Sequence, residues 1–327
     1  MERRVSMADV ATVAGVSGQT VSRVVNGSPR VDPATRRRVE DAMAELDYRP
    51  HRAARALRTG RTDTIGLVVS TLATVGNSRM LQAIAAAAAD RGFALTVVTA
   101  SGRDAVAQGF ARLHEQGVDG AIVLNEATAL ARGVEVPSSL ALVVVDSPPD
   151  DRYVVVQTDH AAGARAATAH LLGLGHRTVH HLAGPAGSYA ATERERGWRE
   201  ALRAAGIAAA EPLRGDWSSA SGHAAAVDVP ADATALFAAN DQMALGALRA
   251  LAEAGRDVPR EISVVGFDDV ADAAQYRPPL TTVRQDFDAL GAAAVDALVA
   301  AIGGGRSPAA MLTPTLVERA SVAAPPA

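Results

Sequence analysis

The chain has 327 residues, too many for a single ordinary core and typical of two or three modules. Hydrophobic residues make up 48% of it, which supports a packed core and excludes wholesale disorder. Cysteine is absent, which excludes a disulfide framework, a thiolate metal site and a cysteine nucleophile. The sequence shows neither a secretory signal nor an apolar stretch of membrane-spanning length, so we expect a cytoplasmic protein with no membrane partner.

The charge is distributed unevenly along the chain. Residues 1–62 contain 12 Arg and 7 acidic residues, a net charge of +5, whereas the other 265 residues contain 20 Arg and 29 acidic residues, a net charge of -9. The basic N-terminal part indicates an anionic partner for that part alone. A solvated basic surface without a partner is the alternative.

The first fifty residues predict three short helices. Ser6, Ser17 and Asp32 are each suited to cap the start of one helix, and Pro33 fits the first position of the third. A tight turn at Gly15 separates the first two helices, so the segment has the helix-turn-helix pattern.

The second of these helices divides into two faces. Thr20, Val21, Val24 and Val25 fall on one arc, and the opposite arc carries Gly18, Gln19, Ser22 and Arg23. Arginine recognises guanine in the major groove and glutamine recognises adenine, so the second face is suited to DNA. A three-helix bundle with no DNA role would show the same periodicity.

The amino-acid sequence of this segment indicates a function more specifically than its helical periodicity does. Residues 5–11 (VSMADVA), 14–17 (AGVS) and 19–26 (QTVSRVVN) closely resemble the headpiece of the lactose-repressor family of bacterial transcription regulators. The resemblance implies binding to double-stranded, palindromic operator DNA. It assigns the DNA contacts to Ser17, Gly18, Gln19, Thr20, Ser22, Arg23, Asn26, Arg30, Ala54 and Leu57. Gly18 departs from the pattern, because a bulky base-contacting aromatic is implied there.

Residues 51–62 form a basic linker between the two charge regions. Its alanines favour a helix that is too short to be stable alone and could form on contact with DNA or with a second copy. Leu57 is an apolar residue among arginines, which suits a wedge inserted into a minor groove. The resemblance identifies this segment as the hinge helix. The alternative is a flexible tether with Leu57 packed on the core.

From residue 63 onward, short apolar strands alternate with helices. Such alternation predicts parallel sheets covered on both faces, and the number of strands predicts two half-domains with a ligand cleft between them. We expect strands at 64–69, 94–99, 120–124, 140–145, 154–156, 178–182, 233–239, 261–267 and 280–283, with helices that include 80–91, 161–174, 194–205 and 242–254.

Polar residues follow several of the expected strands. Asp146, Asn240, Asp268 and Gln285 each come at or just after a strand end, and Arg194 is expected to start a helix. Together with the aromatic face of Trp217, these groups suit a neutral polyhydroxylated ligand. Helix capping and turn formation are the alternative roles of such residues. No nucleotide-binding glycine motif, nucleophile elbow or metal-spaced histidine cluster occurs, so we expect no enzyme, no cofactor and no metal site.

The family resemblance extends through the core, on residues 184–185, 197–198, 215–218, 239–247, 262–269 and 278–287. It implies a periplasmic-binding-protein-like core of two doubly wound parallel-sheet lobes below a small all-α helix-turn-helix headpiece. The implied division is 1–50 for the headpiece, 51–62 for the hinge and 63–327 for the core, with a first lobe of 63–158 and 287–314 and a second lobe of 159–286 and 315–327. The implied effector contacts are Ser70, Asp146, Arg194, Trp217, Asn240, Asp268, Gln285 and Phe287.

These observations predict a repressor of a sugar-utilisation operon that a small sugar inducer releases from its operator, with a galactoside as the first candidate. Leu124 and the 74–77 loop depart from the family's first-lobe contacts, and the tail at 321–327 has no heptad leucines, so we expect a homodimer and no tetramer. One alternative is a repressor that responds to another sugar or to a phosphorylated or nucleobase effector. A sugar-binding protein with no role at DNA is the alternative from a different class.

Overall fold

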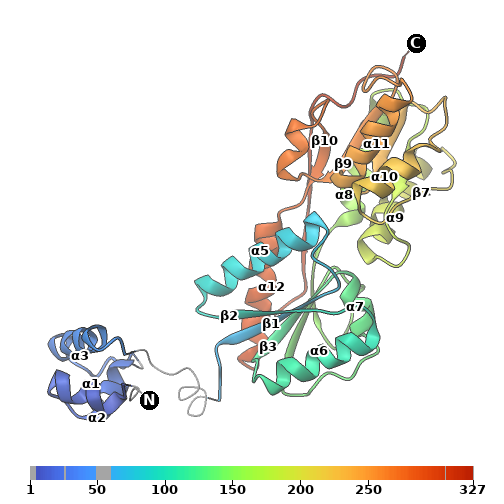
Figure 1. Ribbon diagram of the computed structural model, residues 1–327. Helices are drawn as coiled ribbons and strands as arrows, with labels where there is room; N and C mark the ends of the chain where they lie inside the picture. Colours follow the sequence, from blue (N-terminus) through green and yellow to red (C-terminus); the bar gives the residue numbers. More distant parts are fainter. Residues whose placement is uncertain (1–4, 26, 49–59, 306, 327) are drawn as a thin grey trace. The chain divides into compact units, whose positions relative to one another are not determined.

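The computed structural model describes residues 5–25, 27–48, 60–305 and 307–326. The chain separates into two compact units, Met1–Thr62 and Asp63–Ala327, which are taken in turn below (Figure 1). No helix among the described residues is both long and apolar enough to cross a membrane.

The first unit, the headpiece, contains three helices: α1 (Met7–Ala14), α2 (Gly18–Val25) and α3 (Pro33–Glu45). The expected caps are confirmed, because Ser6 and Asp9 form a reciprocal capping box on α1 and Asp32 accepts the amide hydrogens of the first turn of α3. The side chains of Val10, Val21 and Val39, one from each helix, are fully buried against one another in the headpiece core.

The second unit, the core, contains two six-stranded sheets. The first lobe has strand order β11-β5-β4-β3-β1-β2, and all of its strand pairs are parallel. Helices α5 (Val75–Asp90) and α12 (Phe287–Ile302) cover one face, and α6 (Arg103–Glu115) and α7 (Glu126–Ala131) cover the other (Figure 1). The strands are β1 (Thr64–Val69), β2 (Ala94–Thr99), β3 (Gly120–Leu124), β4 (Ala141–Val145), β5 (Val154–Thr158) and β11 (Ala310–Leu312).

The second lobe repeats this plan with strand order β12-β10-β9-β8-β6-β7. Helices α8 (His160–Gly173) and α9 (Tyr189–Ala204) lie on one face, and α10 (Ser219–Ala226) and α11 (Asp241–Glu253) on the other, with a short 3-10 helix η1 (Ala271–Gln275) after β9. The strands are β6 (His180–Ala183), β7 (Leu213–Arg214), β8 (Ala235–Ala238), β9 (Ser263–Asp268), β10 (Thr281–Arg284) and β12 (Thr315–Val317).

The chain passes between the two sheets three times, after β5, after β10 and after β11. Both lobes are therefore built from segments that are distant in the sequence. The last described segment closes the second lobe, since Ser321 accepts the amide hydrogen of Thr281 at 2.8 Å and donates its hydroxyl to Val264 O at 2.6 Å.

The expected two-lobed α/β core is confirmed, with two corrections. The sheets are not wholly parallel, because β12 runs antiparallel to β10 at the edge of the second sheet. Arg194 does not start a helix: α9 begins five residues earlier, where the Ser188 hydroxyl accepts the amide hydrogen of Ala191. The strands β7, β11 and β12 were not expected at all.

Close packing of α8 against α9 depends on Gly197. A Cβ atom at this position would lie 2.1 Å from the backbone oxygen of Ala161, far inside van der Waals contact. We expect Gly197→Ala to push the two helices apart and to lower the free energy of unfolding by about 2–3 kcal/mol. Urea unfolding measures this, and Gly187→Ala is the control, because no heavy atom lies within 4 Å of a Cβ there. Equal stability of the two variants would contradict the packing argument.

Candidate functional site

The headpiece presents the second face of α2 to solvent. Gly18, Gln19 and Arg23 are exposed and Ser22 is half-buried, whereas Val21 and Val24 are buried. The Ser17 hydroxyl accepts the amide hydrogen of Thr20 at 3.2 Å and thereby fixes the start of this helix. Arg30 is also exposed. Gly18, Gln19 and Arg23 of the predicted polar face are thus exposed to solvent.

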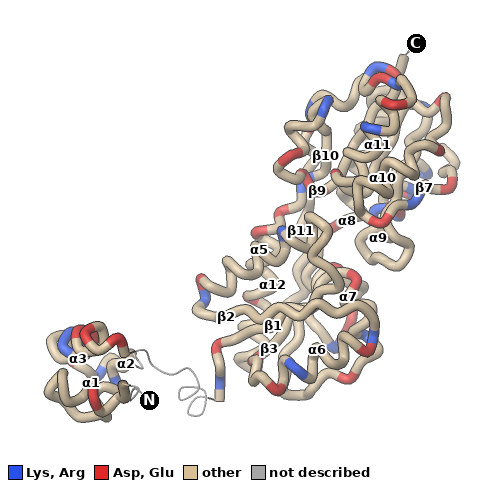
Figure 2. The backbone as a smooth tube through the Cα atoms, in the orientation of Figure 1, with Lys and Arg blue, Asp and Glu red and all other residues tan. Residues whose placement is uncertain are grey.

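Both Arg and acidic residues lie on the helices of the headpiece (Figure 2). Residues 5–48 contain five Arg and six acidic residues, so most of the excess of Arg in residues 1–62 comes from 1–4 and 49–62. Three of the residues expected to contact DNA, Asn26, Ala54 and Leu57, lie outside the described residues, as does the expected hinge helix except for its last three residues.

The core contains a cleft between its two lobes, at the carboxyl ends of the strands. The space between the lining residues amounts to about 450 Å³ when the part open to solvent is included. Seven of the eight expected effector residues line it: Asp146, Arg194, Trp217, Asn240, Asp268, Gln285 and Phe287. Ser70 is the exception, because it is half-buried at the end of β1 and does not line the cleft.

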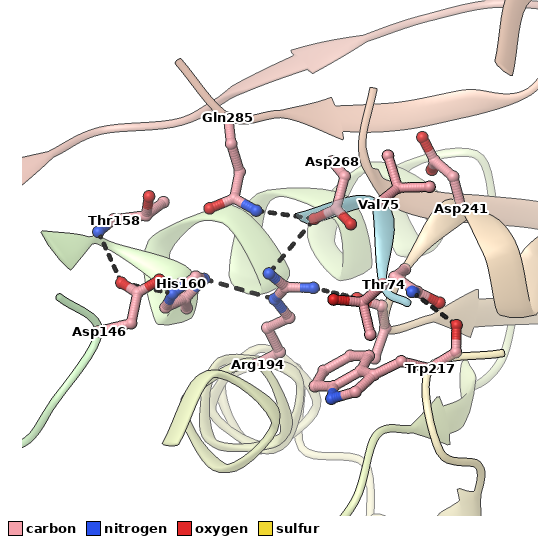
Figure 3. A network of polar contacts seen from close by, with 12 residues as sticks. Thr74, Val75, Asp146, Thr158, His160, Arg194, Trp217, Asp241, Asp268 and Gln285 are labelled. Atoms are coloured by element: carbon pink, nitrogen blue, oxygen red, sulfur yellow. Dashed lines mark hydrogen bonds and ion pairs between the residues drawn. The ribbon is translucent and has the colours of Figure 1, made fainter. Parts of the chain in front are cut away.

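Arg194 is the centre of a buried polar network in this cleft (Figure 3). Its side chain projects from α9, and the residue is 4% exposed. Nη2 lies 3.3 Å from Asp268 Oδ1, and Nη1 donates to the backbone oxygen of Ala239. Gln285 Nε2 donates to the same Asp268 oxygen at 2.7 Å. Burial raises the pKa of Asp268, and the positive charge of Arg194 opposes that rise.

The network continues into the first lobe through His160. Arg194 Nε donates to His160 Nδ1 at 3.4 Å, and His160 Nε2 lies 3.0 Å from Asp146 Oδ1. Asp146 follows β4 of the first sheet and also accepts the amide hydrogen of Thr158 at 3.2 Å. A guanidinium of one lobe is therefore linked to a carboxylate of the other through one buried imidazole.

Trp217 provides the aromatic wall of the cleft, and two contacts within its own lobe hold it in spite of a strained backbone. Its carbonyl accepts a hydrogen bond from Asn240 Nδ2 at 3.0 Å. Its ring lies over Gly184, where a Cβ atom would come within 2.4 Å of the indole. Its φ angle is +77°, a conformation that costs energy in a residue other than glycine. The indole is thus fixed before any ligand arrives.

Backbone strain is concentrated around the cleft. Seven non-glycine residues within the described part of the chain have a positive φ, and four of them line the cleft: Asn125, Asp146, Trp217 and Asp268. Such residues persist where the surrounding structure over-determines them, which occurs mostly at binding and catalytic sites.

Several cleft residues were not expected as contacts from the sequence. They lie at the end of β3 (Asn125 and Glu126) and in or before the first turns of α5, for example Thr74, Asn77 and Met80. Two hydrogen bonds join the lobes here: Trp217 Nε1 donates to Glu126 Oε1 at 3.2 Å, and Val75 N donates to Gln242 Oε1 at 3.1 Å. The only available signal was the position of Asn125 and Glu126 directly after a strand.

The chemistry of the lining favours a neutral, hydroxyl-rich ligand. Among the described lining residues, Arg194 is the one cation, and it stands against the carboxylates of Glu126, Asp146 and Asp268. Amide and carboxylate groups form hydrogen bonds with hydroxyl groups, and an indole covers the apolar face of a sugar ring. No cluster of three or more His, Asp or Glu side chains suited to a metal ion occurs in the part of the chain that the structure describes.

Comparison with known proteins matches two parts of the chain to known families. Residues 6–51 match the family described as bacterial regulatory proteins, lacI family, and residues 168–322 match the periplasmic binding protein-like domain. The lactose operon repressor of Escherichia coli K12 is 40% identical, over 98% of this chain and 91% of that protein. This chain belongs to the lacI family.

Other lacI-family relatives show how widely the ligand varies. The transcriptional regulator CelR of Thermobifida fusca is 40% identical, over 88% of this chain and 89% of that protein. Among solved structures, the lac repressor dimer bound to operator and the anti-inducer ONPF has a TM-score of 0.86 at 37% identity, covering 98% of this chain and 100% of that one. The complex of CelR with cellobiose has a TM-score of 0.73 at 35% identity, covering 97% and 100%. This lacI-family chain is thus a transcriptional regulator and not an enzyme, as expected.

Proposed function

We propose that this protein is a sequence-specific repressor of a sugar-utilisation operon, and that a neutral sugar bound in the cleft of the core releases it from its operator. The observation that carries the proposal is the presence in one chain of an exposed helix-turn-helix face and of a cleft lined by polar side chains from both lobes. The protein acts in the cytoplasm, where its operator lies.

At the DNA, Arg23 and Gln19 on the exposed face of α2 contact base edges, while the arginines of residues 49–62 contact phosphates. A single helix-turn-helix covers half of a site, so a homodimer with two-fold symmetry binds a palindromic operator. Leu57 of each copy enters the minor groove as a wedge. The solved lac repressor dimer on its operator supports this arrangement.

In the cleft, Arg194, Asn240 and Asp268 bind ring hydroxyls, and Trp217 and Phe287 cover the apolar face of the sugar. A galactoside is one candidate, because the lactose operon repressor is 40% identical to this chain. A cellobiose-like glucoside is the other, because CelR is equally similar and has been solved with cellobiose. A phosphorylated effector is disfavoured by the three carboxylates of the lining.

A titration of sugar with and without operator tests the proposal. The operator is first selected from random duplexes by the full-length chain, and galactose, lactose, glucose and cellobiose are then titrated against protein alone and against the complex. Linkage requires that the operator weakens sugar binding by the same factor by which the sugar weakens operator binding. The variant Arg23→Ala is the control for DNA, because it should lose the selected sequence and keep its sugar affinity. Equal sugar affinities with and without operator would refute the inducible-repressor function.

A further inference from the structure

Glu126 lies in the cleft on the side of the first lobe. It is the first residue of α7 and follows Asn125 at the carboxyl end of β3. Its Oε1 accepts the indole N–H of Trp217, a residue of the second lobe, at 3.2 Å. The carboxylate therefore faces both the ligand space and the aromatic wall of the opposite lobe.

The position of Glu126 is fixed by the residues around it. The amide of Asn125 donates to Val145 O at 3.1 Å, and the carbonyl of Asn125 accepts the hydroxyl of Thr128 at 2.7 Å. The side chain of Asn125 also donates to Asn77 on α5. The backbone that carries Glu126 is thus attached to the neighbouring strand, its own helix and a second helix.

The second lobe itself holds the carbonyl of Trp217 and packs Gly184 against its ring, and the hydrogen bond from Glu126 adds a contact to the indole N–H from the opposite lobe. Within the described residues, the carboxylate of Glu126 has this one hydrogen bond, which leaves its second oxygen without a donor. A carboxylate fixed at this point attracts hydrogen-bond donors and repels anionic groups of any ligand that enters beside the indole.

The other charges of the cleft leave an anionic ligand little attraction to offset repulsion by the Glu126 carboxylate. The positive charge of Arg194 is already paired with the carboxylate of Asp268, so a ligand anion would compete with that carboxylate, whereas the N–H groups not used by Asp268, Ala239 O and His160 can still bind neutral hydroxyls. An anionic ligand in the cleft would also meet the carboxylates of Glu126 and Asp146. Repulsion between like charges disfavours its binding, and the repulsion is stronger in a partly buried cleft than in water.

We propose that Glu126 is a specificity-determining residue of the cleft, which orients Trp217 through its indole N–H and excludes anionic sugars by its negative charge. The inference rests on the proposed function, because it needs a sugar that binds in the cleft. Its two parts, orientation and charge, are separable, since glutamine retains the acceptor oxygen and removes the charge.

The charge is tested with Glu126→Gln and paired probes: galactose with galactose 6-phosphate, and cellobiose with cellobiose 6-phosphate. We expect the wild-type chain to bind the neutral member of a pair at least tenfold more tightly, by calorimetry. In Glu126→Gln this ratio should shrink at least fivefold, because the phosphorylated member no longer meets the negative charge. Glu135→Gln is the matched control, because Glu135 is an exposed residue of the same lobe that does not line the cleft.

The orientation is tested without any ligand by fluorescence. Trp217 and Trp198 are the two tryptophans of the chain, and Trp198 is fully buried with its indole N–H donated to Val179 O. After subtraction of the spectrum of Trp217→Phe, the emission of Trp217 should shift in Glu126→Ala and stay near the wild type in Glu126→Gln. Identical emission in all three proteins would overturn the orienting role.

Three results for the sugars would count against the proposals in different ways. Sugar binding with the same neutral-to-phosphate ratio in the wild type and in Glu126→Gln would overturn the charge role and leave the proposed function intact. If no neutral sugar binds the wild-type chain, the proposed function and the charge role fail together. A wild-type preference for the phosphorylated probe would overturn both.

Discussion

Replacing Arg194 with alanine is expected to give a repressor that holds its operator and no longer responds to sugar. The residue is 4% exposed and its guanidinium contacts Asp268, Ala239 O and His160, so its loss removes the central donor of the cleft. We expect sugar affinity to fall by a factor on the order of 100 or more, because several buried acceptors lose a charged partner. Operator affinity should stay within about threefold of the wild type, because none of these contacts is in the headpiece.

The same substitution should also destabilise the core, because it leaves Asp268 buried without its cation. Breaking such a buried pair costs about 3–5 kcal/mol. The double variant Arg194→Ala/Asp268→Asn removes the unpaired carboxyl and should recover much of the stability, but not the response to sugar. Operator binding with and without sugar, together with urea unfolding, separates the two effects. A single variant that sugar still releases would show that Arg194 is not part of the effector site.

Asp241, the first residue of α11, is expected to make the stability of the core depend on pH. The side chain is fully buried, and burial raises its pKa to about 8, helped by the negative charges of Asp268 and Asp269. Thr282 Oγ1 and the amide of Val270 contact its two oxygens at 2.5 and 2.9 Å. The folded chain therefore keeps a proton that the unfolded chain loses near pH 4. Stability present below that pH is lost as the pH rises towards 8, by at most about 1.4 kcal/mol per unit.

Asp241→Asn should remove this dependence. Asparagine cannot ionise, and it provides both an acceptor for the Val270 amide and a donor for the Thr282 hydroxyl. We expect the variant to match the wild type near pH 4 and to exceed it by a margin that grows towards pH 8, measured by urea unfolding at each pH. Asp228→Asn changes an exposed carboxyl of the same lobe and should have no such effect. If the difference in the free energy of unfolding between Asp241→Asn and the wild type does not change with pH, Asp241 does not ionise in this range.

The fold was predictable where a strand contains a run of five or six mainly apolar residues, as in β1, β2 and β3. The ranges of β1, β2 and β3 agree with the expected ones to the residue, because apolar runs there end at charged or turn-forming residues. The edge strands β7, β11 and β12 contain two or three residues each and are half exposed, so none of them shows an apolar run of ordinary strand length. Such short strands form because they pair with a neighbouring strand that is distant in the sequence, and the local sequence does not identify that partner.

The candidate site was predictable in its second lobe more than in its first. Asn240, Asp268 and Gln285 follow strands of one sheet, and parallel strands bring their carboxyl ends to one edge. Glu126 and the start of α5 line the cleft only because the two lobes pack together. A local sequence pattern does not predict how the lobes pack. Ser70 also follows a strand but does not line the cleft, so a place directly after a strand is not sufficient to identify a cleft residue.

The three passages of the chain between the sheets affect the order in which the protein can be made. The helices of the headpiece are complete once residue 48 has left the ribosome, and they have a hydrophobic core of their own. The first lobe lacks α12 and β11 until residue 312, and the second lobe lacks β12 and Ser321 until residue 321. Both lobes therefore wait for almost the whole chain to be translated. A polypeptide released early would carry a finished headpiece beside a core that lacks strands in both of its sheets.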